Sequence, residues 1–147
     1  MSGKYINASA LADGKMLVHL KKKFIEDRSK ENLFPLMGCL RDSKLILPMT
    51  PQKGAKVRPD VFANSEGDLF LPLFSQNEQM PEDYKVLFTF IPLPIENCIK
   101  TAKELKSSND RYKGIVLDPF TDGMYITFEM MDLIMEFEPK VRTTTEE

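Results

Sequence analysis

Residues 68–78, DLFLPLFSQNE, decide the fold of this chain. Their first half is a run of leucine and phenylalanine that is typical of a buried strand. The run is closed by Ser75, and Glu78 follows three positions later, which is the spacing of a capping box. In a capping box the serine hydroxyl accepts from the backbone N–H of the glutamate, whose carboxylate accepts from the N–H of the serine. The stretch therefore predicts a strand that runs directly into a short helix, with Phe74 at the corner.

A second apolar run with a similar ending lies at residues 114–121, GIVLDPFT. It also ends in a proline and a phenylalanine, Pro119 and Phe120. Two runs of this kind favour adjacent central strands around which the rest of the chain packs. Prolines at the ends of both strands would bring the two following loops to one edge of the sheet.

Two helices are expected before the first strand. Apolar spacing predicts a helix from Lys15 to about residue 27 and a second helix that includes residues 33–40. Asn32 is the preferred cap of the second helix, because Pro35 then falls in the first turn, where no backbone hydrogen bond is lost. Ser29 is the alternative cap, and it would leave Pro35 to kink the helix.

The other expected strands are short and bounded by turn residues. Asn64 and Gly67 suit a four-residue hairpin loop between an outer strand and the central one. A polar loop is expected at residues 52–58. The strands themselves are expected at residues 44–49, 60–63, 86–91, 113–117 and 124–126.

Two more helices follow from apolar stripes. Pro94 suits the first turn of a helix that ends near residues 107–109. Thr127 is expected to cap the last helix. The side chains expected to face inward are Ile95, Cys98, Ile99, Ala102 and Leu105 on the first of these helices, and Met130, Met131, Ile134 and Met135 on the second.

Length and charge limit the function classes. The chain has 147 residues, so we expect one domain at residues 15–137 with a flexible lead-in at 1–14 and a flexible tail at 138–147. A net charge of −2 argues against nucleic acid as the main partner. The only basic run, residues 21–23, is interpreted as a solvated helix face. Without a membrane span or a disulfide framework, the chain is expected to be cytoplasmic and not to bind a membrane.

Candidate catalytic and metal-binding residues are few. His19 is the only histidine and has no nucleophile beside it in the sequence. Cys39 and Cys98 are far apart and are interpreted as small buried side chains, so no zinc site and no nucleophile is predicted. Glycine-rich phosphate loops are missing from the sequence, and no cofactor is expected.

The acidic turn between the last two strands allows two interpretations. Asp118 and Asp122 flank a Pro-Phe-Thr turn at the end of a central strand, where functional sites often lie. Two such carboxylates could carry out acid–base chemistry or bind a cation. The structural interpretation is favoured, because aspartate before proline starts turns and Asp-Gly ends them.

Three segments, taken in order, resemble the N-terminal domain of the SseB family. They are residues 45–48 (LILP) after a helix that contains Asn-Leu, residues 71–76 (LPLFSQ) and residues 114–120 (GIVLDPF). The resemblance covers residues 15–135, although Asp118 and Ser75 stand where the family commonly has asparagine and threonine. It implies a bacterial protein of a family without an established activity, and it transfers no catalytic residue. From the chain length we expect no second domain of the kind that many relatives carry.

The order of the elements predicts a single α+β domain, with a mixed sheet of five or six short strands and helices packed against it. The favoured function is a non-enzymatic module of the bacterial cytosol that binds a protein partner. The alternative is a small hydrolase or ligand-processing enzyme that uses Asp118 and Asp122. The proposed binding residues lie at the two corners, where Phe120 is expected to be exposed unless both phenylalanines plug the core. They are Phe74, Ser75, Asp118, Pro119 and Phe120.

Overall fold

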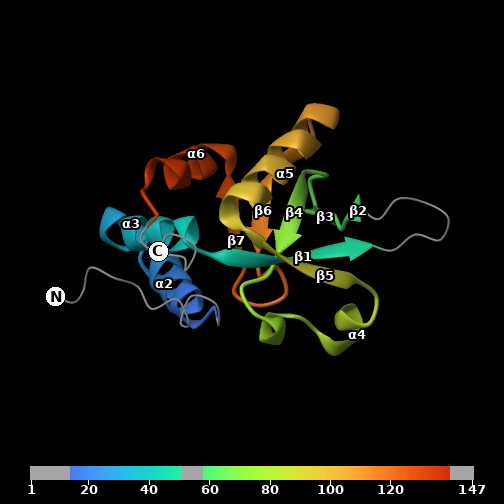
Figure 1. Ribbon diagram of the computed structural model, residues 1–147, viewed down its shortest axis with the longest axis horizontal. Coiled ribbons are helices and arrows are strands. Elements are labelled where there is room, and N and C mark those ends of the chain that lie inside the picture. The colour runs from blue at the N-terminus through green and yellow to red at the C-terminus, as the bar shows by residue number, and fades with distance from the viewer. Residues whose placement is uncertain (1–13, 51–57, 140–147) are drawn as a thin grey trace, which may run out of the picture.

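The computed structural model describes residues 14–50 and 58–139, and within them the chain has α+β architecture (Figure 1). This confirms the predicted fold class. The strands divide between two sheets rather than one, with the orders β2-β1-β5 and β3-β4-β6-β7. Most of the expected lead-in (1–14), loop (52–58) and tail (138–147) lies outside the described residues.

The four-stranded sheet contains the two runs that end in a corner. β4 and β6 are its central strands and pair in parallel, with Leu73 opposite Leu117. The prediction of adjacent central strands is therefore confirmed. The hairpin between β3 and β4 is also confirmed, because the N–H of Gly67 donates to the carbonyl of Asn64 at 3.1 Å. The four strands are β3 (Phe62–Ala63), β4 (Leu69–Leu73), β6 (Tyr112–Leu117) and β7 (Met124–Thr127).

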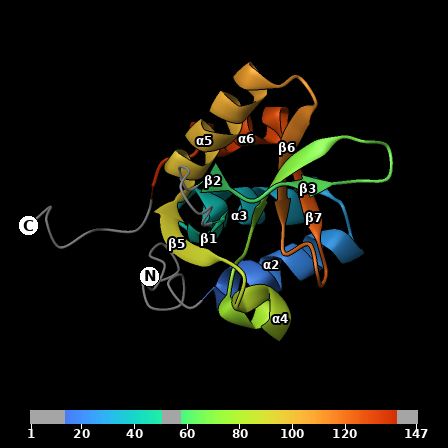
Figure 2. The ribbon, with the colours of Figure 1, turned by 90° about the vertical axis from the view of Figure 1, so that its right-hand side faces the viewer.

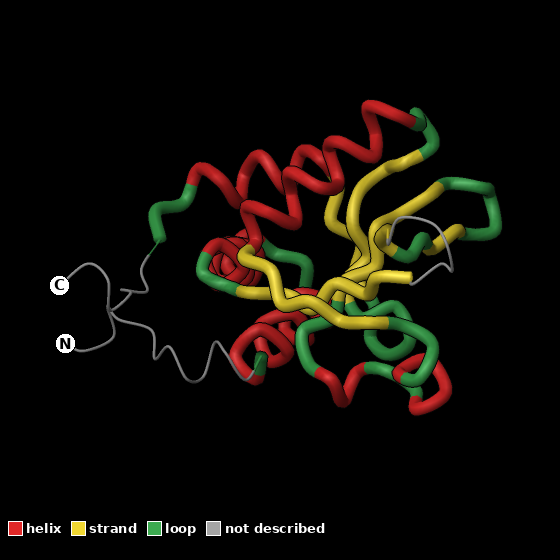
Figure 3. Tube along the Cα trace, turned by 45° about the vertical axis from the view of Figure 1, so that its right-hand side comes forward, coloured by secondary structure: helices red, strands yellow, loops and turns green. Residues whose placement is uncertain are grey.

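The three-stranded sheet is antiparallel and consists of β1 (Lys44–Thr50), β2 (Arg58–Pro59) and β5 (Thr89–Pro94). Ile46 exchanges two backbone hydrogen bonds with Phe74, of 2.8 and 3.0 Å, which join this sheet to the end of β4. Phe74 thus stands at the junction of the two sheets, which Figure 3 shows in yellow.

The prediction of a strand over residues 86–91 is only partly correct. β5 starts three residues later, at Thr89, and a short helix, α4 (Glu82–Lys85), comes before it. Val86 and Leu87 are 81% and 65% exposed, so the first part of this apolar run lies on the surface.

Helices cover the sheets on two sides. α2 (Lys15–Glu26) packs against α3 (Lys30–Arg41), and α3 also contacts α6 (Phe128–Glu136). α5 (Ile95–Ser108) lies against β6 and β1 (Figures 1 and 2). The first and last helices of the described residues, α2 and α6, are thus connected through α3.

The predicted cap of α3 is wrong. The helix begins after Ser29, whose carbonyl accepts from the N–H of Leu33 at 2.9 Å, and Pro35 lies inside it. Asn32 instead donates from its side chain to the carbonyls of Asp27, at 2.8 Å, and Lys23, at 3.3 Å. These two hydrogen bonds tie the start of α3 to the end of α2, a role for Asn32 that its position before the proline does not reveal.

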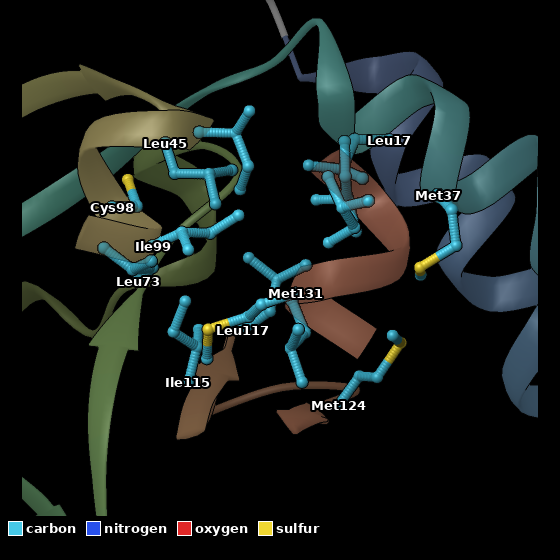
Figure 4. Packing of buried hydrophobic residues seen from close by; sticks show 14 of the residues in the cluster. Leu17, Met37, Leu45, Leu73, Cys98, Ile99, Ile115, Leu117, Met124 and Met131 are labelled. Atoms are coloured by element: carbon cyan, nitrogen blue, oxygen red, sulfur yellow. The ribbon is translucent and has the colours of Figure 1, made fainter. Parts of the chain in front are cut away.

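The predicted helix faces are largely confirmed. Ile99 of α5 is buried among residues of β4, β6 and α6 (Figure 4). The hydroxyl of Thr127 caps α6 by accepting from the N–H of Met130 at 3.2 Å. Met135 was expected inside but is 37% exposed, because α6 turns only its Met131 and Ile134 face fully inward.

Candidate functional site

The two corners of the sequence meet at one end of the four-stranded sheet. β4 and β6 run in the same direction and end in register, so the residues that follow them are neighbours. The N–H of Asp118 continues the ladder and donates to the carbonyl of Leu73 at 2.8 Å. Phe74 and Ser75 therefore lie beside Asp118 and the turn that contains Phe120.

Ser75 does not form the predicted capping box. Its N–H donates to Oδ1 of Asp118 at 2.9 Å, and its hydroxyl donates to Oδ2 of the same carboxylate at 2.7 Å. The short helix that follows is a 3-10 turn, η2 (Asn77–Gln79), and its cap residue, Gln76, makes no side-chain capping bond. Ser75 bonds to the buried carboxylate of Asp118 rather than forming the local cap, because the carboxylate accepts from both donors of Ser75 at once.

Lys21 is the third member of this group, and the sequence interpretation missed it. It is 2% exposed, and its Nζ donates to Oδ2 of Asp118 at 2.9 Å and to the carbonyl of Asp122 at 2.6 Å. The expectation of a solvated lysine run is therefore wrong for Lys21. Lys22 and Lys23 are exposed as expected. We call Lys21, Ser75 and Asp118 the polar latch.

The polar latch supplies the hydrogen bonds that the buried carboxylate of Asp118 cannot make to water. Asp118 is 0% exposed, and three donors from Ser75 and Lys21 reach its two oxygens. An ion in such a site would be costly without a partner and hydrogen bonds. Asp118 also has a φ of 54°, in the left-handed region that aspartate and asparagine tolerate better than most residues. The latch thus connects α2 to the ends of β4 and β6.

The structure does not place Asp118 and Asp122 in one pocket. The side chain of Asp122 is exposed, and only its backbone carbonyl contacts Lys21. A cavity of about 650 Å³ lies beside the corner, and neither aspartate lines it. Its walls are formed by Lys44, Ile46, Ser75, Gln76, Asn77, Glu78, Phe90 and Pro92. Because Asp118 is 0% exposed and bonded to Ser75 and Lys21, no substrate could contact its carboxylate without movement of these residues.

Aromatic rings form the outer part of the corner. Phe74 is 0% exposed, whereas Phe120 is 46% exposed and stacks on Phe74 with ring centroids 6.1 Å apart. Tyr84 of α4 packs against both rings, at 5.5 Å from Phe74 and 5.0 Å from Phe120. Only Phe74 plugs the core, and Phe120 presents one side to solvent.

Tyr84 was not predicted as part of the site, because the segment after Pro81 has no clear periodicity. Its hydroxyl donates to Oδ2 of Asp60 at 2.9 Å. Burial, and to a lesser extent the hydrogen bond to Asp60, raise the pKa of Tyr84 above its ordinary value. Tyr84 therefore stays neutral and holds α4 against the turn.

The other candidates have no reactive environment. Burial raises the pKa of Cys39 to about 11 and that of Cys98 to about 12, so both thiols are protonated at neutral pH. His19 is exposed on α2. Within residues 14–50 and 58–139, no three His, Cys, Asp or Glu side chains are arranged to hold a metal ion. None of the helices described is both long and apolar enough to cross a membrane.

The comparison with protein families identifies the domain. The family model described as SseB protein N-terminal domain matches residues 10–131. The chain belongs to the SseB family. This SseB domain includes the polar latch and the aromatic corner, since all their residues lie within the matched range. Neither the search of curated proteins nor the search of solved structures found a match.

Proposed function

We propose that this SseB domain is a non-enzymatic module of the bacterial cytosol that binds a protein partner through its corner. The corner surface consists of Phe74, Ser75, Asp118, Pro119 and Phe120. The observation that carries the proposal is the position of Phe120, which is 46% exposed while its ring stacks on the buried ring of Phe74. Half-exposed aromatic side chains on a rigid base are frequent anchors of protein interfaces.

The polar latch supports this role by fixing the turn before any partner arrives. Asp118 is held by Ser75 and Lys21, and Lys21 also holds the carbonyl of Asp122. Phe120 lies between these two fixed points. A surface that is ordered in advance loses little conformational entropy on binding, so more of the contact energy remains as affinity.

The five residues have different tasks in this proposal. Phe120 and the partly exposed Pro119 would contact the partner. Phe74, Ser75 and Asp118 are buried and would position them. Substitution of the buried residues would therefore change stability as well as binding. Substitution of Phe120 changes the contact surface while leaving the buried side chains in place.

The test is affinity capture from cells of the source organism, with the wild-type chain and Phe120→Ala as baits and mass spectrometry as the readout. Phe34→Ala is the matched control, because Phe34 is also 46% exposed and rests on another ring, that of Phe137. We expect Phe34→Ala to retain the partner and Phe120→Ala to lose it at an unchanged melting temperature. Equal capture by all three baits, or a large drop in melting temperature for Phe120→Ala, contradicts the proposal.

A further inference from the structure

Two further exposed apolar side chains follow α4, the helix whose Tyr84 packs on Phe120. Val86 and Leu87, at the end of α4, are 81% and 65% exposed. Tyr84 connects them to the corner, because its ring packs on Phe120 at 5.0 Å and its carbonyl accepts from the N–H of Leu87 at 3.1 Å. Figures 1 and 2 both show α4 at the same end of the molecule as the turn between β6 and β7. Phe120, Val86 and Leu87 together are called the apolar patch.

The elements that carry or adjoin the apolar patch also carry exposed carboxylates. Exposed acidic side chains lie on η2, on α4 and on the turn, and the hydroxyl of Thr121 donates to the side chain of Gln79 to tie the turn to η2. Residues 77–87 and 118–123 contain one cation, Lys85, which is paired with Glu82 at 3.0 Å. The exposed Lys22 and Lys23 belong to α2, and the exposed Lys44 of β1 lines the cavity that Glu78 also lines. The acidic rim consists of Glu78, Glu82, Asp83 and Asp122.

The neighbouring sheet edge, β5, is poorly suited to binding a peptide as an added strand. Pro92 of β5 lies opposite Ile46 of β1. The N–H and carbonyl of Ile46 are both hydrogen-bonded to Phe74 on the other side of β1, so Ile46 and Pro92 form a pair without hydrogen bonds between them. The backbone of positions 92 and 94 therefore faces outward, and both are prolines without an N–H. The same alternation turns the backbone of Phe90 outward, so an added strand would find a donor at only one of the three outward positions. Strand addition is therefore disfavoured at this edge, and a partner that packs side chains on the surface is favoured.

We propose that the partner segment is an amphipathic peptide whose apolar residues cover the apolar patch and whose flanking residues are lysine or arginine. This inference rests on the proposed function and adds the chemistry of the partner. Basic flanks complement the acidic rim, whereas acidic flanks would place like charges together and would be rejected. The apolar residues supply the contact, and the charges select which apolar segment is accepted.

The probe is a pair of synthetic peptides that share one set of leucine and phenylalanine residues. One peptide carries lysine at the flanking positions, and the other carries glutamate. Binding is measured by fluorescence anisotropy at low and high salt. We expect the lysine peptide to bind at least about tenfold more tightly at low salt, and the difference to shrink when the Debye length falls to about 3 Å at 1 M salt.

Three variants show where the peptide binds. Glu82→Lys/Asp83→Lys/Asp122→Lys should reverse the preference between the two peptides. The matched control changes three exposed carboxylates on other elements and should preserve the preference. Phe120→Ala should lower the affinity for the lysine peptide about tenfold or more if Phe120 is the anchor. The control substitutions are Glu66→Lys, Glu104→Lys and Glu129→Lys.

The outcomes separate this inference from the proposed function. Equal affinity for the two peptides, tighter binding of the glutamate peptide, or no binding of the lysine peptide overturns the inference. Binding that Phe120→Ala does not change also overturns it, because the lysine peptide would then be attracted by net charge alone. If capture of a cellular partner still depends on Phe120, the proposed function survives with a partner of different chemistry.

Discussion

Replacement of Lys21 by methionine should destabilise the protein more than any other change of a single charged residue described above. Methionine keeps much of the length and the apolar stem of lysine, so the change removes mainly the ammonium group. Asp118 is then left as a buried carboxylate without its cation, at 0% exposure. The carbonyl of Asp122 loses its donor as well. The turn that carries Phe120 would keep its two hydrogen bonds from Ser75 at Asp118 but would lose its fixed point at Asp122.

The expected cost follows from the burial of the pair. Lys21 and Asp118 have side-chain exposures of 2% and 0%, and removal of one partner from a buried ion pair costs about 3–5 kcal/mol. Lys103→Met is the matched control. It breaks the pair with Asp132, which also has a 2.9 Å contact but whose side chains are 49% and 65% exposed. Exposed pairs contribute about 0–1 kcal/mol.

Urea unfolding followed by circular dichroism measures both variants, since the chain has no tryptophan for fluorescence. The double variant Lys21→Met/Asp118→Asn should recover part of the loss. Asparagine removes the unpaired charge, keeps an oxygen that can accept from Ser75, and tolerates a φ of 54°. A cost below about 1 kcal/mol for Lys21→Met, equal to that of Lys103→Met, would refute the reasoning.

Three further predictions concern the core, a helix end and the thiols. Ile99→Ala should lower the free energy of unfolding by about 2–5 kcal/mol, because Ile99 is 4% exposed and packs in the main core; a change under about 1 kcal/mol in urea unfolding would contradict this packing. Thr127→Ala should cost about 1 kcal/mol through loss of the α6 cap, whereas Thr127→Ser should cost clearly less in the same assay. Burial raises the pKa of Cys39 from 9.0 to about 11 and that of Cys98 from 9.0 to about 12, so the stability that each thiol contributes is complete below pH 9 and is lost as the pH rises through the folded-state pKa. Urea midpoints between pH 8 and 11 should show this decline, and Cys39→Ala/Cys98→Ala should show a smaller one.

Features that depend on neighbours in the sequence were predictable. The leucine-rich runs around Leu73 and Leu117 identified the central strands, since only a strand in the middle of a sheet buries so many consecutive side chains. Thr127 was identified as a cap from its own type and position. The Asn64–Gly67 loop followed from turn chemistry. In each case the sequence pattern that allowed the prediction spans only a few residues.

The polar latch was not predictable from local patterns. Ser75 and Asp118 are 43 positions apart, and Lys21 and Asp118 are 97 apart. The Ser-x-x-Glu spacing that suggested a cap has the same appearance whether or not a distant carboxylate competes for the serine. Lys21 did leave a signal, because it lies four residues after Leu17 and three before Phe24, on the buried face of α2. The neighbouring lysines masked that signal by suggesting a solvated run.

The exposure of Val86 and Leu87 was also not predictable from the local pattern. Val86 and Leu87 belong to a run that resembles a buried strand, yet β5 uses only its last part. Strand propensity reports how well a side chain fits a half-buried pleated surface, and it does not say which residues the sheet will cover. The part of the run left outside the sheet is the part that we assign to a partner.

The most direct test of the central claim, that the corner is a binding surface on a rigid base, is an amide-shift map of the ¹⁵N-labelled chain with its captured partner. We expect the partner to change the amide chemical shifts of residues 74–79, of residues 118–123 and of the end of α4. The amide chemical shifts of α5 and α6 should not change. A footprint on α5 and α6, with the corner amides unchanged, would contradict the claim.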